Sequence, residues 1–388
     1  MMLGLAIGSL VIACLPAIMF AKNLPAFLFP IQSRKQNHEV DDHEGIAGQH
    51  SHQSGVSVLI PARDEQDGIA ASVNAALQSQ GVSLEVLVLD DHSTDRTAQI
   101  VQQIAETDSR VRYLSGDELP EGWNGKQFGC KQLAEAADYS LLVFIDADVR
   151  LKPDALQRLA DCYAATGVGL LSAFPHQETG TILEKWIIPL MHFVLLGFCP
   201  LDRMRNDSSP ALAAGCGQLF MTEQQAYQTA GTHAAIRGSR HDGVKLPRAY
   251  RAAGLMSDVY DGCELADCRM YHSAREVVRG VLKNATEGLA APKLIFPFTI
   301  LLLGGSVLPV ILLTLGCLQG NVAAAAVAGA AVLVGHVPRI LAAIRLRQSW
   351  VGVICHAPAM LLFVLLQWVA FLNHLLGRQV AWRGRTSS

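Results

Sequence analysis

The sequence predicts an α/β domain with a mostly parallel sheet, accompanied by transmembrane α-helices. Short apolar runs alternate with stretches of helical length between residues 56 and 165, a pattern typical of parallel sheets covered by helices. Three of those apolar runs end in clusters of polar residues. Long apolar segments stand near both ends of the 388-residue chain, and their length is typical of membrane spans.

The N-terminal segment, residues 1–30, is predicted to be a retained transmembrane anchor. Residues 1–20 carry no charge, and apolar character resumes over residues 24–29. A cleaved signal peptide would begin with basic residues, which are missing at the start of this segment. The basic pair Arg34-Lys35 follows, which favours the cytoplasm for that side of the membrane. Residues 31–55 are polar and are predicted to form a linker.

Residues 56–290 are predicted to form a cytoplasmic domain in which strands and helices alternate. Strands are expected at residues 56–60, 84–89, 111–114 and 141–145, and helices at residues 66–80, 94–106 and 153–165. Ligands of such sheets bind beyond the carboxyl ends of the parallel strands. The residues that follow each strand are therefore the first candidates for a functional site.

Polar clusters follow three of these strands. Residues 61–65 are Pro-Ala-Arg-Asp-Glu, residues 90–95 are Asp-Asp-His-Ser-Thr-Asp, and residues 146–148 are Asp-Ala-Asp. One acidic strand end is usually a turn or a helix cap, but three together predict a site for a ligand with a base, a ribose and phosphates. Asp146 and Asp148 are expected to face the same way, and their hard oxygens suit Mg²⁺ or Mn²⁺.

Composition and missing motifs exclude several classes of protein. The net charge of −3 gives no broad basic surface, so no nucleic-acid partner is expected. Nine cysteines occur without a Cys-x-x-Cys pair, which argues against a disulfide framework or a zinc site. The chain has no Gly-x-x-x-x-Gly-Lys-Ser/Thr loop and no Gly-x-Gly-x-x-Gly after a strand, so the P-loop and dinucleotide-binding classes are excluded.

Three further apolar stretches, residues 294–318, 322–337 and 351–376, are expected to span the membrane within a C-terminal region of residues 291–376. Arginines 339, 345 and 347 stand between the last two stretches, and a basic tail follows at residues 377–388; both mark the cytoplasm. Three spans after a cytoplasmic domain would leave that tail outside. Either one stretch is re-entrant, or residues 187–201 also enter the bilayer of this multi-pass protein of the cell (inner) membrane.

The ordered motifs resemble those of family 2 glycosyltransferases, which have the GT-A fold of nucleotide-diphospho-sugar transferases. Within that family the later motifs are similar to a bacterial membrane branch that includes carotenoid- and hopanoid-associated enzymes. The resemblance covers about residues 56–284. Besides the three strand ends, it rests on Gly122-Trp123-Asn124-Gly125-Lys126, Gly217-Gln218, Gly231-Thr232-His233, His241-Asp242 and Arg269-Met270-Tyr271.

This resemblance implies a donor site, a metal site and a catalytic base. Asp242 would be the base, and Asp146 and Asp148 would carry the divalent metal. The donor, a UDP-sugar, would be held by Pro61, Arg63, Glu65, Asp90, Asp91, Lys126 and Asp146. Residues assigned less firmly, with acceptor contact as one role, are Trp123, Gln218, His233, His241 and Arg279.

The chain departs from the family pattern in two places. His241 stands where the family usually has an acidic residue before the base, and residues 276–280 lack the Gln-x-x-Arg-Trp motif of processive relatives. The second departure lowers the expectation of a polysaccharide synthase. Apart from the resemblance, Asp242 is better explained as a cap of a helix at about residues 244–253.

One base without a nucleophilic Ser or Cys arrangement predicts a single displacement with inversion at the sugar. The base removes the proton of the acceptor group, for which desolvation is expected to raise the pKa of Asp242. The predicted function is a membrane-bound hexosyltransferase acting on a lipid-like hydroxyl or carboxylate acceptor. Alternatives are a polyprenyl-phosphate or polysaccharide glycosyltransferase and, outside enzymes, a catalytically silent membrane scaffold.

Overall fold

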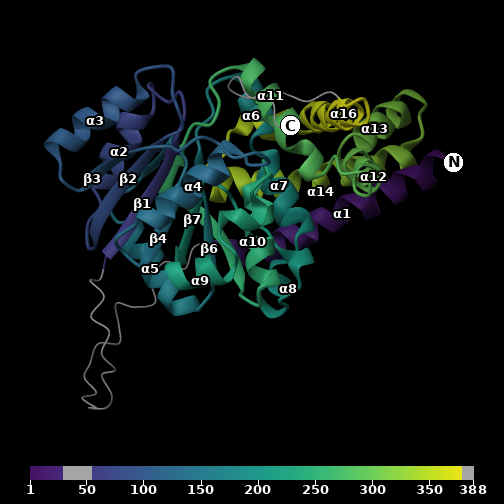
Figure 1. The fold of residues 1–388 in the computed structure, drawn as a ribbon. Coiled ribbons are helices and arrows are strands. Elements are labelled where there is room, and N and C mark those ends of the chain that lie inside the picture. The colour runs from purple at the N-terminus through teal and green to yellow at the C-terminus, as the bar shows by residue number, and fades with distance from the viewer. Residues whose placement is uncertain (29–54, 378–388) are drawn as a thin grey trace, which may run out of the picture.

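The structure is a computed structural model that describes residues 1–28 and 55–377. These residues form a sheet domain with a group of apolar helices beside it (Figure 1). The sheet has the strand order β3-β2-β1-β4-β7-β6-β8-β5. Residues 31–54 of the predicted linker and residues 378–388 of the predicted tail lie outside the described part of the chain, as do Arg34 and Lys35.

The first half of the sheet is parallel, as the sequence predicts. It consists of β1 (Gly55–Ala62), β2 (Ser83–Asp90), β3 (Val111–Ser115) and β4 (Leu141–Ile145). β1 pairs in parallel with both β2 and β4, and β2 pairs in parallel with β3. The carboxyl ends of these strands therefore meet at one edge.

The second half of the sheet is mixed, and the sequence analysis assigned none of its strands. It contains β5 (Val149–Leu151), β6 (Leu170–Gln177), β7 (Leu219–Glu223) and β8 (Ser257–Cys268). β7 runs antiparallel to β4 and to β6, β8 is parallel to β6, and β5 is antiparallel to β8. Four of the seven strand pairings are parallel, so the prediction of a mostly parallel sheet is confirmed by a narrow margin.

Helices cover both faces of the sheet, because alternate strand residues point to opposite faces. On one face, Val58 and Ile60 of β1 pack with α2 (Ile69–Leu77), α3 (Thr97–Thr107) and α5 (Ala155–Thr166). On the other face, Leu59 packs with α4 (Gly125–Ala136), α9 (Gln224–Thr229) and α10 (Asp242–Ala252). Three 3-10 turns complete the domain, η1 (Pro210–Leu212), η2 (His233–Ile236) and η3 (Ala285–Glu287).

Two predicted helices, at residues 66–80 and 94–106, begin three residues later in the structure. The cause is a set of hydrogen bonds between the loops that follow β1 and β2. The backbone N–H of Gln66 donates to Asp95 at 3.0 Å, and that of Thr94 donates to Asp64 at 2.7 Å. The carboxylates thus tie the two loops together before α2 and α3 begin.

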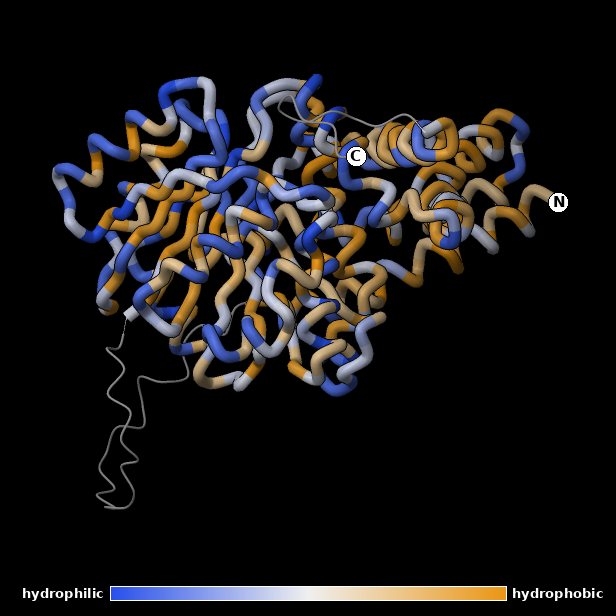
Figure 2. The backbone as a smooth tube through the Cα atoms, viewed as in Figure 1, coloured by the Kyte–Doolittle hydropathy of each residue, from blue (hydrophilic) through white to orange (hydrophobic). Residues whose placement is uncertain are grey.

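Within the described residues, three helices are long and apolar enough to cross a membrane, namely α1 (Met2–Phe27), α14 (Val322–Arg345) and α16 (His356–Leu375). The pair α12 (Ile295–Ser306) and α13 (Leu308–Leu318) meets the same test as one span bent by 42°. Apolar residues run along all of them (Figure 2). Apolar side chains such as Val11, Ile18 and Leu333 are more than half exposed, as expected of a surface that faces lipid.

The predicted end of the middle C-terminal span, at residue 337, is wrong. α14 continues through Pro338 to Arg345, so Arg339 and Arg345 belong to the helix and not to a loop. In apolar surroundings a helix continues through a proline, because unwinding would leave more backbone groups without a hydrogen-bond partner, and no water is there to replace it. Arg347 alone of the three arginines lies beyond the helix.

Short helices join the sheet domain to the apolar group. They are α6 (Ile182–Ile187), α7 (Leu190–Phe198), α8 (Leu201–Asn206), α11 (Ala274–Asn284) and α15 (Trp350–Ile354). Residues 187–201, one of the two alternatives for a further bilayer segment, comprise the end of α6, α7 and the start of α8. Leu190 and Phe193 of α7 share a core with Leu302 of α12 and Val364 of α16.

The last turns of α1 belong to the core of the sheet domain. Phe20, Leu24 and Phe27 pack in one cluster with Phe174 of β6 and Val259 of β8. Asn23, 1% exposed, donates to the backbone carbonyls of Leu196 and Cys199 at 2.8 and 2.6 Å. Its Oδ1 accepts from the N–H of Leu201 at 3.3 Å. α1 therefore holds the turn between α7 and α8.

Asn23→Ala is expected to destabilise the protein by about 1–3 kcal/mol, because it leaves buried backbone groups of α7 and α8 without partners. Thermal unfolding of the purified protein in detergent would measure the effect. Lys22→Ala is the matched control, since the Lys22–Asp202 ion pair at 2.8 Å is exposed and contributes about 1 kcal/mol or less. Equal losses in the two variants would contradict the role of Asn23.

Candidate active site

The structure brings the three polar strand ends together at one edge of the sheet. Arg63, after β1, donates to the carbonyl of Asp91 at 3.0 Å and lies 3.4 Å from its carboxylate. The N–H of Asp64 donates to Ser93 at 2.9 Å. Glu65 lies close enough to Asp148, after β4, for their charges to interact. The arrangement follows from the parallel order β2-β1-β4.

A lysine bridges two carboxylates at the centre of this edge. Lys126 is the second residue of α4, Asp146 follows β4, and Asp242 is the first residue of α10. The Lys126 Nζ atom lies 2.5 Å from Asp146 Oδ1 and 2.7 Å from Asp242 Oδ2. It also donates to the carbonyl of Gly217 at 3.1 Å. Helix α10 thus places the carboxylate of Asp242 opposite the strand ends, on the other side of Lys126.

Gly217 permits the close approach of Asp242. A Cβ atom at position 217 would collide with the Asp242 carboxylate. The two residues line a small hollow together with Lys126 and Asp146. Its apolar walls include Pro61, Phe144 and Phe220. Glycine is therefore required at position 217 for the carboxylate of Asp242 to face the site.

The pKa of Asp242 is lowered, contrary to the expectation from desolvation. Burial acts to raise it, but the charge and hydrogen bond of the Lys126 ammonium outweigh burial. Burial and repulsion from Asp242 raise the pKa of Asp146 in spite of the same lysine. In this arrangement Asp242 is ionised at neutral pH, and it interacts with a cation rather than an apolar surface.

Asp148 has the properties of a cation ligand. Its Oδ1 atom is buried and has no hydrogen-bond partner among the described residues. Burial, followed by repulsion from Asp146 and Glu65, raises the pKa of Asp148 to about 7. A buried oxygen without a partner, next to further carboxylates, is a suitable ligand for a hard divalent cation. The residues present thus fit a metal of this kind.

The protein alone offers a small ligand set. Within residues 1–28 and 55–377, no three His, Cys, Asp or Glu side chains are grouped as metal ligands. For a metal held by Asp146 and Asp148, further ligands would come from a bound molecule or water, as is usual for Mg²⁺ at phosphates.

Other residues singled out from the sequence lie around this centre in different ways. His233 of η2 lines the hollow, and its Nδ1 atom lies 2.8 Å from the hydroxyl of Tyr227. Burial lowers the pKa of His233 to about 3, so its ring is neutral. His241 is the N-cap residue of α10, next to Asp242. Gln218 accepts from Gln177 at 2.7 Å, and its carbonyl accepts from the N–H of Asp146 at 3.2 Å.

The remaining two assignments are at the margin of the site. Trp123 lies in the loop before α4 and packs edge-on against Phe128, with ring centroids 5.2 Å apart. Arg279 is on α11 with an exposed side chain. Asp90, in contrast, is 5% exposed and accepts from the N–H of Ser93 at 3.3 Å, so it shapes the loop after β2.

Lys283 is a residue that the sequence analysis missed. It lies one helical turn after Arg279 on α11, and burial lowers its pKa to about 8. The charges of Lys126, Asp242 and Asp146 all act on it, which places its ammonium beside the bridged carboxylates. Lys283 follows Arg279 by four residues, so the sequence places both on the same side of a helix. The local sequence does not indicate which of the two basic residues faces the site.

The carboxylates at the ends of the parallel strands, and the carboxylate from α10 that faces them across Lys126, lie on a domain with the GT-A fold. The fold agrees with that of a mannosyltransferase from Pyrobaculum calidifontis, solved in complex with GDP-Man and Mn²⁺. The TM-score is 0.53 at 15% sequence identity, over 96% of this chain and 99% of that one. At this identity the likeness establishes the fold alone.

The sequence is also similar to that of known proteins. Residues 57–225 match the model for Glycosyl transferase family 2. The chain is also 30% identical over 244 residues to the 4,4'-diaponeurosporenoate glycosyltransferase of Staphylococcus aureus strain USA300. The match covers 61% of this chain and 62% of that enzyme. The same figures describe the match to the enzyme of strain MRSA252.

Proposed function

We propose that this protein is a membrane-bound glycosyltransferase that moves a sugar from a nucleotide-diphosphate donor to a lipid-like acceptor. The observation that carries the proposal is the group formed by Asp146, Asp148, Lys126 and Asp242 at the carboxyl edge of the sheet. The group combines a place for a cation with a carboxylate base on the opposite side. A silent scaffold would have no need for a buried carboxylate oxygen without a partner, which costs stability.

The donor nucleotide would lie over the ends of β1 and β2. Pro61, Arg63, Glu65, Asp90 and Asp91 surround that position, and the pair of Arg63 with Asp91 orients the carboxylate. Carboxylate oxygens accept hydrogen bonds from ribose hydroxyls and from base N–H groups. A UDP-sugar is the proposed donor.

Asp146 and Asp148 would hold Mg²⁺ or Mn²⁺ at the diphosphate. Such a metal stabilises the negative charge that develops on a departing phosphate. Lys126 and Lys283 supply two further positive charges beside it. When a diphosphate binds, Lys126 would also pair with the phosphate oxygens, and its ion pair with Asp242 would weaken. The pKa of Asp242 then rises, which strengthens it as a base.

Asp242 would remove the proton of the acceptor hydroxyl as the acceptor oxygen attacks the anomeric carbon. The bond between that carbon and the diphosphate oxygen breaks in the same step, so the sugar inverts. The proton goes to Asp242, and the negative charge leaves with the nucleoside diphosphate. For a carboxylate acceptor no proton needs to move, and Asp242 would only position the attacking group.

The acceptor is proposed to reach the site from the bilayer. The helices that pass the test for membrane spans share cores with α7 and with β6 and β8 of the sheet domain. A relative is a diaponeurosporenoate glycosyltransferase, which supports a carotenoid-like or similar lipid acceptor. A cytoplasmic position of the sheet domain is supported by the nine cysteines, all of which are free.

The test is a transfer assay with the purified full-length protein in detergent. It is supplied with UDP-[¹⁴C]hexose, Mn²⁺ and a total lipid extract. Radioactivity that moves into the organic phase only with active protein supports the proposal. Donor hydrolysis without any labelled lipid would refute the lipid acceptor, and turnover with GDP-sugars alone would refute the UDP donor. Mass spectrometry of the labelled lipid would separate a polyprenyl phosphate from other acceptors.

Lys283→Gln is expected to lower kcat/KM by about 10- to 100-fold, because a cation beside the donor phosphates is lost. Arg279→Gln, one turn earlier on the same helix, is expected to change kcat/KM by about twofold or less, since exposed charges contribute little. Steady-state kinetics with varied donor would measure both. The reverse order of effects would favour the assignment of Arg279 over Lys283.

A further inference from the structure

A buried arginine without a counter-charge lies where α14 meets the sheet domain. Arg339 is 1% exposed. Its Nη1 atom donates to Gln348 at 3.4 Å, but its Nε and Nη2 atoms have no hydrogen-bond partner among the described residues. None of the ion pairs formed by those residues includes it. A buried cation in this state is costly unless an anion joins it.

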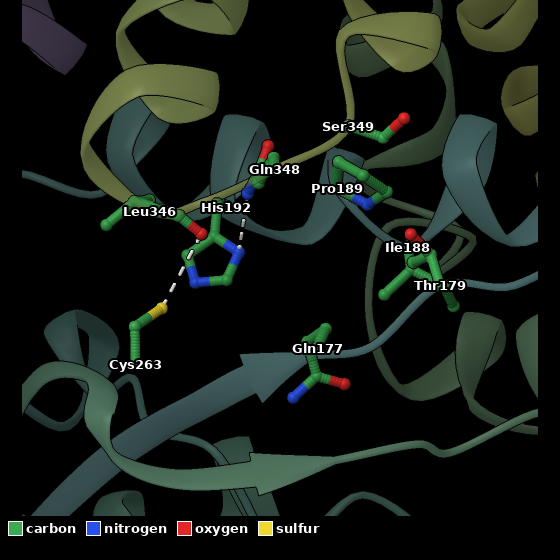
Figure 3. Close-up of a pocket in the computed structure, with 9 residues that line it drawn as sticks. All are labelled: Gln177, Thr179, Ile188, Pro189, His192, Cys263, Leu346, Gln348 and Ser349. Carbon is green, nitrogen blue, oxygen red and sulfur yellow. Dashed lines mark hydrogen bonds between the residues drawn. The ribbon is translucent and has the colours of Figure 1, made fainter.

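A small hollow lies beside Gln348, the residue that bonds Arg339 (Figure 3). Its walls come from Gln177 at the end of β6, His192 of α7, Cys263 of β8, and Gln348 and Ser349 after α14. Gln348, which bonds Arg339, thus also faces the hollow. The Oε1 atom of Gln177 is buried without a partner among the residues that the structure describes.

His192 adds a second unsatisfied donor. Its side chain is 3% exposed, and its ring packs against Phe27 and Phe174. Nδ1 lies 3.2 Å from Nε2 of Gln348, while Nε2 of the ring has no partner within the described residues. Burial, helped by the charge of Arg339, lowers the pKa of His192 to about 3. The ring is therefore neutral, and Arg339 is the charge of this cluster.

The surface next to the hollow has the composition of a membrane interface. Ile344, Trp350 and Ile354 are apolar and more than half exposed. The side chains of Arg345 and Arg347 are exposed between them in sequence. Exposed tryptophan and arginine beside apolar side chains are typical of the level of lipid headgroups.

We propose that Arg339, Gln348 and His192 form a binding site for the oxyanion headgroup of an anionic membrane lipid. The guanidinium would bind two oxygens with its unpartnered Nε and Nη2 groups, an arrangement in which arginine excels. The His192 ring and the Gln348 amide would bind the remaining oxygen atoms. The acyl chains would leave toward the exposed apolar residues of α14 and α15. This site is separate from the transfer reaction, and the inference does not depend on that reaction.

The test measures lipid binding to the full-length, delipidated protein in neutral detergent. Added phosphatidic acid is expected to raise the melting temperature and to give a lipid adduct in native mass spectrometry. Phosphatidylcholine, which is neutral overall, and inorganic phosphate alone are expected to have little effect. Arg339→Met should weaken the binding of phosphatidic acid by about tenfold or more. Arg345→Met is the matched control, because Arg345 is exposed on the same helix.

A second readout separates a binding site from a structural role. If Arg339 waits for a ligand, Arg339→Met should raise the melting temperature of the delipidated protein, since an unpaired buried charge is removed. If the residue were purely structural, the variant would melt lower and bind lipid as before. His192→Phe keeps a ring between Phe27 and Phe174 and should also weaken lipid binding. Binding that is unchanged in both variants, or an equal response to free phosphate, would overturn the proposal.

Discussion

Replacement of Asp242 by asparagine is expected to reduce glycosyl transfer by about 10²- to 10⁴-fold, the usual contribution of a general base. The amide keeps the shape of the side chain and removes its capacity to take a proton. Donor binding should persist, because Lys126 retains its pair with Asp146. The assay compares transfer rates with the affinity for UDP measured by titration calorimetry.

Asp161→Asn is the control for Asp242→Asn. Asp161 is exposed on α5, on the other face of the sheet from α10. The transfer rate of the Asp161→Asn variant should therefore equal that of the wild type. Transfer by Asp242→Asn at a comparable rate to a hydroxyl-bearing acceptor would remove Asp242 from the role of base. If the natural acceptor is a carboxylate, a much smaller loss is expected, and the size of the effect then reports the acceptor chemistry.

Asp148→Asn is expected to abolish the stimulation of transfer by Mn²⁺ and to lower kcat/KM by about 10²-fold or more, since a metal ligand is lost. The same change should raise the melting temperature in the presence of EDTA. It replaces a buried carboxylate, repelled by Asp146 and Glu65, with a neutral amide. Activity as a function of Mn²⁺ concentration and thermal unfolding in EDTA would check the two outcomes.

The opposite signs of these effects make the test of Asp148 specific. A variant that was merely misfolded would lose both activity and stability. Asp154→Asn serves as the control, because its side chain is 62% exposed and pairs with Arg158 on the surface. If Mn²⁺ stimulated Asp148→Asn as strongly as the wild type, Asp148 would not be a ligand of the metal.

The parallel half of the sheet was predictable because three of its four strands, β1, β2 and β4, are largely apolar runs followed by polar clusters. The strands β6 and β8 include polar residues such as Ser172, Asp258 and Asp261, which are buried in the structure. Their burial depends on partners distant in sequence, for example Cys216, whose N–H donates to Ser172 at 2.7 Å. Periodicity alone does not reveal such strands.

The candidate site, like the sheet, was predictable from the sequence only in part. The strand-end carboxylates follow from local sequence and topology, whereas the sign of the pKa shift of Asp242 depends on Lys126, which is placed by another helix. The choice between Arg279 and Lys283 likewise depends on how α11 is rotated against the sheet domain. Rotation is set by tertiary packing, including the contact of Gly280 with Tyr271.

The position of the first helix has a practical consequence for dissecting this protein. A fragment that starts at residue 55 would lack Phe20, Leu24 and Phe27 and would present their apolar partners to solvent. It would also lack Asn23, whose bond to Leu196 joins residues 173 positions apart. A soluble catalytic fragment made by deleting the N-terminal helix is therefore expected to aggregate. During synthesis, α1 would complete its contacts only after α14 has been made, because Phe20 shares a core with Ala342.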